Sequence, residues 1–143
     1  MAILPEILIV EDDAATQMLL SAVVARLGFH PTVTGDGAAA LSMIAARPFA
    51  VLLLDILMPK MSGLDVLRQL KVRTPELMAR TIVLTVATEV TSRDCPELLE
   101  IAAFLRKPVD IDVLATTIYA CADSVSPRPD EKRAGGLETT IRR

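Results

Sequence analysis

The sequence predicts an α/β protein built on a doubly wound, five-stranded parallel sheet. Short apolar runs rich in branched side chains alternate with longer segments of helical periodicity. Such runs are typical of strands buried on both faces of a parallel sheet. Strands separated by helices imply right-handed crossovers, which place helices on both faces. Several runs also end on a charged or hydroxyl residue, which indicates a site at one edge of the sheet.

Five segments are predicted as strands, each short, apolar and followed by residues that favour turns or helix starts. In chain order they are residues 7–10, 31–34, 51–54, 82–84 and 104–106. The second is the least apolar of the five. His30, the only histidine, precedes it and is expected in a surface loop. A lone histidine in that position gives no support to a serine-type catalytic triad.

The helices are predicted from apolar spacing and from residues that start or stop helices. Asp13 is expected to cap the first helix, which Gly28 ends, and Asp36 opens the second, which stops before Pro48. The third follows Gly63. The apolar residues expected to face inward, together with other leucines and methionines of the helices, are Leu19, Leu20, Val23, Val24, Leu27, Leu41, Ile44, Leu64, Leu67, Leu70, Ile111, Leu114, Ile118 and Cys121.

The fourth helix of the alternation is predicted to be short. Pro96 falls inside the stretch where this helix is expected, and proline is tolerated only in a first helical turn. We therefore expect the helix to start near Cys95 or Pro96, with residues 89–94 forming a loop. The last helix is expected to start at about Asp110.

Composition fits one compact domain. The chain has 143 residues, 52% of them hydrophobic, and a net charge of -3, which gives no electrostatic reason to expect nucleic-acid binding.

The longest uninterrupted apolar stretch of the chain, residues 49–54, is too short to cross a membrane, and no secretory signal is visible. Cys95 and Cys121 have no metal or redox spacing. Two unpaired thiols suggest a cytoplasmic protein.

The polar residues at the strand ends define a candidate site. Glu11 and Asp12 follow the first run, Asp55 follows the third, Thr85 ends the fourth, and Lys107 follows the fifth. Because ligand sites of open α/β sheets lie beyond the carboxyl ends of strands, these side chains are expected to meet. Carboxylates, a hydroxyl and an ammonium suit a divalent cation and a phosphoryl group.

The chain resembles the response-regulator receiver domains of bacterial two-component phosphorelays over roughly its first 122 residues. The most specific motif is Asp55-Ile56-Leu57-Met58-Pro59-Lys60-Met61-Ser62-Gly63, similar to the family's Asp-x-x-Met-Pro-x-Met-x-Gly. The acidic pair Glu11-Asp12 also matches, and Thr85 and Lys107-Pro108 stand at typical separations, 30 and then 22 residues on. Each match alone is weak, but all of them in order are a strong signal.

The resemblance implies a flavodoxin-like sheet of strand order 2-1-3-4-5 and a role for each matched residue. Asp55 would be the phosphoacceptor, with Lys107 and Thr85 contacting the phosphoryl group. Mg²⁺ would be held by Glu11, Asp12, Asp55 and the backbone carbonyl of Leu57. Phe104 would be a switch residue coupled to Thr85. Pro108 would hold Lys107 in place, most simply through a cis peptide bond.

The resemblance also implies partners. The donor would be a histidine kinase or a histidine phosphotransfer protein. The signal would leave through a face made of the fourth helix, fifth strand and fifth helix. The downstream effector is unknown, direct nucleic-acid or membrane binding is not expected, and a phosphorylation-dependent homodimer is one compatible output. Residues 1–122 would be the receiver domain and 123–143 a disordered tail or linker. Whether the chain stands alone or begins a longer regulator is left open.

Two positions depart from the family pattern. Val86 stands where a small residue is usual, so its bulk is expected to narrow access to the acyl phosphate. Glu100 stands where many relatives have glycine, so the turn before the fifth strand is expected to be built differently. Neither Leu57 nor Ala87 can orient a water through its side chain, which predicts slow autodephosphorylation.

Two other functional classes fit the sequence less well than a phosphoaccepting signalling domain. A phosphatase of the haloacid-dehalogenase type would need a second aspartate two residues after Asp55, where this chain has Leu57. A module that works without phosphorylation would be favoured if Asp12, Asp55, Thr85 or Lys107 were missing, and all are present. The sequence therefore favours a signalling domain, not a turnover enzyme.

Overall fold

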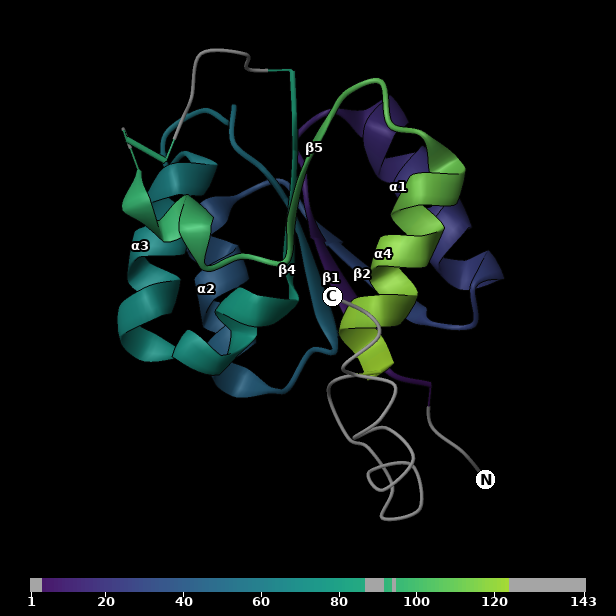
Figure 1. Cartoon of the computed structure of the whole chain (residues 1–143), viewed down its shortest axis with the longest axis horizontal. Coiled ribbons are helices and arrows are strands. Elements are labelled where there is room, and N and C mark those ends of the chain that lie inside the picture. Colours follow the sequence, from purple (N-terminus) through teal and green to yellow (C-terminus); the bar gives the residue numbers. More distant parts are fainter. Residues whose placement is uncertain (1–3, 87–91, 94, 124–143) are drawn as a thin grey trace.

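The computed structural model describes residues 4–86, 92–93 and 95–123, and its core is a five-stranded, all-parallel sheet (Figure 1). The strand order is β2-β1-β3-β4-β5, which confirms the expected flavodoxin-like topology. The strands are β1 (Glu6–Val10), β2 (His30–Thr34), β3 (Val51–Asp55), β4 (Thr81–Thr85) and β5 (Ala103–Arg106). Because all five are parallel, their carboxyl ends lie along one edge.

Helices cover both faces of the sheet, with α2 and α3 on one side and α1 and α4 on the other (Figure 1). Their bounds are α1 (Ala14–Arg26), α2 (Gly37–Ala46), α3 (Gly63–Arg73) and α4 (Ile111–Asp123). Two short 3-10 helices, η1 (Pro75–Arg80) and η2 (Pro96–Leu99), precede β4 and β5. No described helix is long and apolar enough to span a lipid bilayer.

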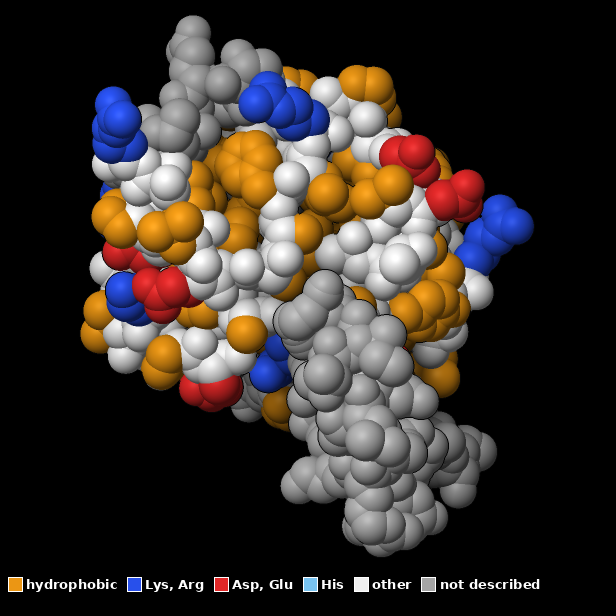
Figure 2. Space-filling view, in the orientation of Figure 1, with side chains coloured by type: hydrophobic (Ala, Val, Ile, Leu, Met, Phe, Trp, Pro, Cys, Tyr) orange, Lys and Arg blue, Asp and Glu red, His pale blue; other side chains and the backbone are white. Residues whose placement is uncertain are grey.

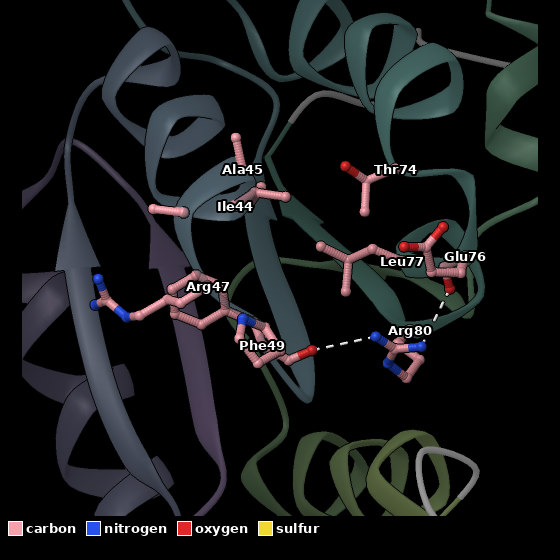
Figure 3. A pocket seen from close by; sticks show the side chains of 10 residues that line it. Ile44, Ala45, Arg47, Phe49, Thr74, Glu76, Leu77 and Arg80 are labelled. Atoms are coloured by element: carbon pink, nitrogen blue, oxygen red, sulfur yellow. Dashed lines mark hydrogen bonds between the residues drawn. The ribbon is translucent and has the colours of Figure 1, made fainter.

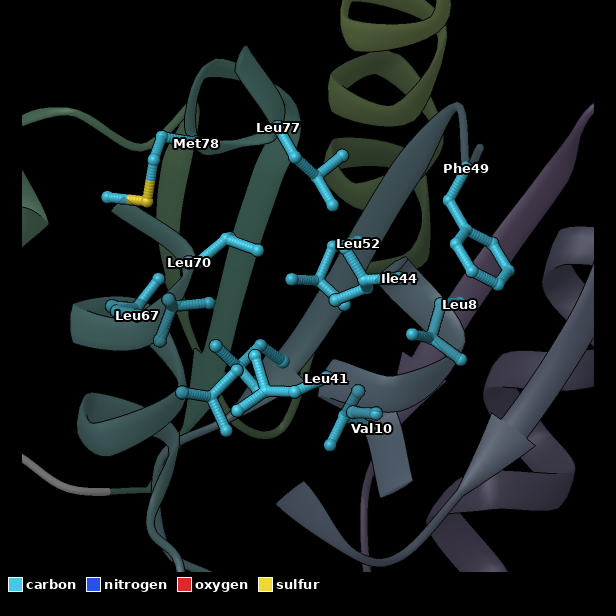
Figure 4. Close-up of a cluster of buried hydrophobic side chains, with 14 of the residues drawn as sticks. Leu8, Val10, Leu41, Ile44, Phe49, Leu52, Leu67, Leu70, Leu77 and Met78 are labelled. Atoms are coloured by element: carbon cyan, nitrogen blue, oxygen red, sulfur yellow. The ribbon is translucent and has the colours of Figure 1, made fainter. Parts of the chain in front are cut away.

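Alternation along the strands divides the core into two layers. Leu8, Leu52 and Leu54 point to the α2–α3 side and pack with Leu67 and Leu70 (Figure 4). The intervening strand residues point to the α1–α4 side, where they pack against helix residues that include Leu20, Val24, Leu114 and Ile118. The central strands β1 and β3 are buried almost throughout. This is the burial that the continuous apolar runs predicted.

Helix starts follow the predicted caps. Asp13 caps α1 by accepting a hydrogen bond from the Thr16 amide at 2.9 Å. Asp36 caps α2 through the amides of Ala38 and Ala39. These short polar side chains satisfy amide groups that have no partner inside the first helical turn.

The expectation that all the helical leucines and methionines face the core is wrong. Met18 is 74% exposed and Leu19 is also largely exposed, because the buried stripe of α1 consists of Leu20, Val23 and Val24. Ile111 is exposed at the first turn of α4, so the inward side begins at Leu114. His30 is exposed as expected, but it is the first residue of edge strand β2 and not a loop residue.

The helix predicted between β4 and β5 is reduced to η2, a single 3-10 segment that begins at Pro96 as expected. The helix labelled α4 follows β5 and is the last helix of the prediction. Glu100 follows it with φ -105° and ψ -4°, which needs no glycine, and its carboxylate pairs with Lys71 of α3 at 2.6 Å. Both side chains are nearly half exposed, so this ion pair is a surface contact between the turn and α3. Most of the expected loop at 89–94 and the tail from 124 onward lie outside the described residues.

Candidate functional site

The predicted site residues meet at the carboxyl edge of the sheet. Asp55 and Thr85 are the last residues of β3 and β4, Glu11 and Asp12 directly follow β1, and Lys107 directly follows β5. Glu11, Asp12 and Asp55 each place a carboxylate oxygen within 4.8 Å of the other two. Asp12 is exposed, whereas Glu11 and Asp55 are buried. The ends of two neighbouring strands, β1 and β3, thus form one acidic cluster in which Asp12 is exposed to solvent.

Lys107 is the cation of this cluster, and its nearest partner is Glu11. Its Nζ lies 2.6 Å from Glu11 Oε1 and 3.5 Å from Asp55 Oδ2. The side chain is 17% exposed, so both interactions are only weakly screened by water. Proximity to Asp55 was expected from the sequence. The shorter pair with Glu11 was not singled out, because the sequence predicts which side chains share the edge but not which of them pair.

Backbone contacts hold Lys107 in position at the end of β5. The Lys107-Pro108 peptide bond is cis, which confirms the sequence-based expectation. The Lys107 amide donates a hydrogen bond to the carbonyl of Thr85 at 3.0 Å, extending the pairing of β5 with β4 by one residue. The ammonium therefore projects from a backbone position anchored to the neighbouring strand.

Asp55 is a strongly buried carboxylate, with 5% of the residue exposed. Burial raises its pKa above the ordinary value, and the negative charge of Glu11 raises it further. Lys107 and the Leu57 amide, which donates to Asp55 Oδ1 at 3.2 Å, lower the pKa and offset part of that rise. The site holds this carboxylate beside like charge, which a bound cation would relieve.

The loop after Asp55 depends on Gly63. A Cβ at this position would lie 2.4 Å from the Asp55 carbonyl oxygen and 2.7 Å from Ile56 Cα, so only glycine fits without a backbone shift. The Gly63 amide donates to the Ile56 carbonyl at 2.9 Å, closing the loop at the first residue of α3. Lys60 occupies the left-handed region at φ 66°. The family motif therefore ends in glycine for a packing reason, close to Asp55.

A second group of contacts orients Glu11. Its Oε2 accepts a hydrogen bond from the Asp13 amide at 3.1 Å. The side-chain amide of Gln17, on α1, donates to the Glu11 carbonyl. Gln17 was not singled out from the sequence, since a glutamine one turn into a helix carries no spacing signal. Glu11 is consequently held by α1 on one side and by Lys107 on the other.

The two predicted switch residues lie on neighbouring strands. Thr85 is fully buried at the end of β4, and Phe104 is partly buried, packed against the core on the α2–α3 side. Phe104 is paired in register with Val83, two residues before Thr85. Coupling between the Phe104 rotamer and the Thr85 hydroxyl stays a prediction.

Two apolar residues next to the site in sequence have exposed side chains. Leu57 is 50% exposed and Val86 is 58% exposed. Leu57 lies two residues after Asp55, and Val86 directly follows Thr85. Ala87 lies outside the described residues. Neither Leu57 nor Val86 offers a side-chain hydrogen-bonding group to a water approaching Asp55.

The arrangement can bind a hard cation, present a carboxylate nucleophile and neutralise an incoming anion. Oxygen ligands at one open edge suit Mg²⁺, which keeps several waters. The Lys107 ammonium lies beside the Asp55 carboxylate. Such a combination is the one that phosphoryl transfer needs, because its catalysis consists mainly of positioning and charge neutralisation.

Comparison with known proteins agrees with this chemistry. The family model described as "Response regulator receiver domain" matches residues 7–119. Response regulator MprA of Mycobacterium sp. (strain KMS) is 33% identical over 138 residues, covering 94% of this chain and 59% of MprA. DNA-binding transcriptional regulator NtrC of Escherichia coli K12 is 34% identical over 104 residues, covering 73% of this chain and 22% of NtrC. The chain thus spans little more than half of MprA and about a fifth of NtrC.

Solved structures agree on the fold. A CheY-like response regulator receiver domain from Methanospirillum hungatei superposes with a TM-score of 0.76 at 24% identity, covering 85% of this chain and 96% of that one. The signal receiver domain of a histidine kinase from Syntrophus aciditrophicus gives 0.73 at 28% identity, covering 87% and 94%. In both cases the similarity extends over almost the whole of the neighbouring chain.

Proposed function

This chain belongs to the response regulator receiver domains of two-component signalling, and on that basis we propose that Asp55 accepts a phosphoryl group from a phosphohistidine partner. The observation that carries the proposal is the convergence of Asp55, two further carboxylates and Lys107 at one edge of the sheet. The partner is a histidine kinase or a histidine phosphotransfer protein. The receiver domain spans residues 1–122.

The transfer step follows from the chemistry of the carboxylate. An oxygen of Asp55 attacks the phosphorus of the phosphohistidine, forming a P–O bond as the P–N bond breaks. The electron pair of the P–N bond stays with the imidazole nitrogen of the partner. Burial and the Leu57 amide hold the Asp55 carboxylate in one orientation before the donor arrives. The product is an acyl phosphate on Asp55.

The donor set fits Mg²⁺. Three carboxylate oxygens within 4.8 Å repel one another, and Lys107 pairs mainly with one of them. A divalent cation would relieve that repulsion and would neutralise charge on the phosphoryl oxygens. Asp12 and Asp55 would ligate it directly, Leu57 would ligate it through the backbone carbonyl, and Glu11 would ligate it directly or through water.

Lys107 and Thr85 would respond to the phosphoryl group. The Lys107 ammonium is 3.5 Å from Asp55 Oδ2 and would turn from Glu11 towards the new negative charge. Thr85 would donate its hydroxyl to a phosphoryl oxygen, and Phe104 would change rotamer in response. The change would reach η2, β5 and α4, which form the signalling face. The domain promotes its own phosphorylation and slow dephosphorylation and is not a turnover enzyme.

The proposal is tested with acetyl phosphate and intact-protein mass spectrometry. Wild type should gain one phosphoryl group per chain with Mg²⁺ and none with excess chelator. Asp12→Asn should slow the gain, because it removes one ligand of the cation. Asp36→Asn is the matched control, since Asp36 caps α2 and is not part of the acidic cluster. Equal labelling with and without Mg²⁺, or no labelling, would contradict the proposal.

A further inference from the structure

Two polar side chains hold backbone carbonyl groups at opposite edges of the sheet. At the edge where β3 begins, Arg80 donates to three backbone carbonyls, including that of Phe49 at 3.2 Å, beside the pocket shown in Figure 3. At the edge where β1 ends, the side-chain amide of Gln17 donates to the carbonyl of Glu11. Of these two contacts, the one made by Gln17 adjoins the acidic cluster.

The backbone of Glu11 is held on both sides of its Cα. Its amide donates to the carbonyl of Thr34, the last residue of β2, at 2.9 Å. Its carbonyl accepts the bond from Gln17, the fourth residue of α1. A Cβ added to Gly35 would lie 3.5 Å from both of the atoms that form this bond, so the turn after β2 packs against it. The peptide group between Glu11 and Asp12 is therefore fixed by contacts from α1 and from the end of β2.

Asp12 is the carboxylate that depends most on this peptide group. The carboxylates of Glu11 and Asp55 are each anchored by a hydrogen bond from a backbone amide and by an ion pair with Lys107. Within the described part of the chain, no hydrogen bond or ion pair holds the Asp12 carboxylate, which is exposed. Its direction is consequently set by the backbone that carries it, and Gln17 holds the peptide group immediately before its Cα.

We propose that Gln17 is a positioning residue for the cation site. By holding the Glu11 carbonyl, it sets the plane of the peptide group before Asp12 and so directs the Asp12 carboxylate towards the acidic cluster. This role rests on the proposed binding of Mg²⁺ by that cluster, and Gln17 acts through the backbone without touching the ion. Loss of a group that orients a metal ligand typically weakens metal binding by about 10–100-fold. Because Asp12 is one ligand among several, loss of the Gln17 contact should raise the Kd for Mg²⁺ by about five- to tenfold.

The Gln17 contact is separate from the proposed signalling face. Apolar side chains gather over η2 and β5 on the side of the molecule shown in Figure 2, where Leu99 is 76% exposed and β5 is only partly buried. Gln17 instead joins α1 to the end of β1. A substitution at Gln17 therefore leaves the residues of the signalling face unchanged.

The test is titration of the ¹⁵N,¹³C-labelled full chain with MgCl₂, followed by nuclear magnetic resonance at a temperature where every variant is folded. Gln17→Met removes the donor but keeps the side-chain length and helix propensity, and Gln17→Asn keeps the amide on a side chain one methylene shorter. Both should raise the Kd by about five- to tenfold and should shift the carbonyl ¹³C resonance of Glu11 before Mg²⁺ is added. Gln69→Met is the matched control, because it makes the same replacement at an exposed position of α3 and should change neither readout.

A wild-type Kd in either Gln17 variant would overturn the positioning role, as would an equal rise of the Kd in Gln69→Met. A lower Tm with an unchanged Kd would make Gln17 a purely structural residue and would also overturn it. In these cases the proposed function still stands, provided that wild type binds Mg²⁺ and is phosphorylated. Absence of Mg²⁺ binding in wild type would instead reject the proposed cation site, and the role of Gln17 with it.

Discussion

Replacement of Gly63 by alanine probes how tightly α3 is packed on the strand end that carries Asp55. The added Cβ would lie 2.4 Å from the Asp55 carbonyl oxygen and 2.7 Å from Ile56 Cα, and backbone atoms cannot rotate away. Overpacking lowers the free energy of unfolding by about 1–3 kcal/mol, and by more where the backbone must move. Replacing glycine by alanine inside a helix raises it by up to about 1 kcal/mol. We expect the free energy of unfolding to fall by about 2 kcal/mol or more.

Gly37→Ala provides the matched control, since Gly37 is the first residue of α2 as Gly63 is of α3. Its Cβ would meet side-chain atoms and not backbone, with Val66 Cγ2 at 2.9 Å and Met61 Cγ at 3.1 Å. We expect this variant to lose less stability than Gly63→Ala, because side chains can shift without moving the strand end. Urea and thermal unfolding should separate the two, with Tm of Gly63→Ala lower than wild type by roughly 6–10 °C. Equal losses in the two variants would refute the packing argument.

Three further predictions concern the acyl phosphate, the cation and acid stability. Leu57→Asn and Val86→Ala should each shorten the acyl-phosphate lifetime, by about tenfold for an aligned water, as followed by loss of phosphorylated protein after donor removal. Mg²⁺ should raise Tm, because its binding adds about 1.4 kcal/mol to the free energy of unfolding at ten times its Kd, and Asp12→Ala should abolish that rise. Hydrogen bonds from Arg47, then from Thr32, lower the pKa of Glu6 below its ordinary 4.5. The resulting stabilisation is complete above pH 4.5 and is lost as pH falls through the lower folded pKa, so Glu6→Gln should flatten the acid limb of the Tm profile.

Each of these has a control or a contradicting result. Decay of the wild-type acyl phosphate within seconds, or unchanged decay in both variants, would reject the argument from Leu57 and Val86. Asp13→Ala removes the cap of α1 and should lower Tm while preserving the Mg²⁺ shift. A full Mg²⁺ shift in Asp12→Ala would argue against this ligand set. An unchanged acid limb in Glu6→Gln would show that the ion pair adds no stability.

Local chemistry explains what could be predicted from sequence. The strands could be predicted because burial on both faces of the sheet requires continuous apolar runs. The helix caps could be predicted because Asp13 and Asp36 bond to amides only a few residues away. The shortened helix at Pro96 follows from the restricted geometry of proline, whereas the cis Lys107-Pro108 bond was expected from the family resemblance. The convergence of site residues followed from topology, since all the parallel strands end at one edge.

Other features depend on three-dimensional packing. Helical spacing allowed Met18 and Leu19 as core residues, but the position of α1 on the sheet left both exposed. The 2.6 Å pair of Lys107 with Glu11 depends on side-chain reach across the sheet edge, which no sequence separation reveals. The use of Arg80 to bind three carbonyls at the opposite edge was also unpredictable, because a lone arginine at the end of a short helix has no distinctive pattern.

The central claim is that Asp55 is the phosphoacceptor, and mapping of the modified residue tests it most directly. The chain would be incubated with acetyl phosphate and Mg²⁺, reduced with borohydride to trap the acyl phosphate, and digested for peptide mass spectrometry. The account predicts modification of Asp55 alone and no modification in Asp55→Asn. Modification of another residue in wild type, or undiminished labelling of Asp55→Asn, would contradict it.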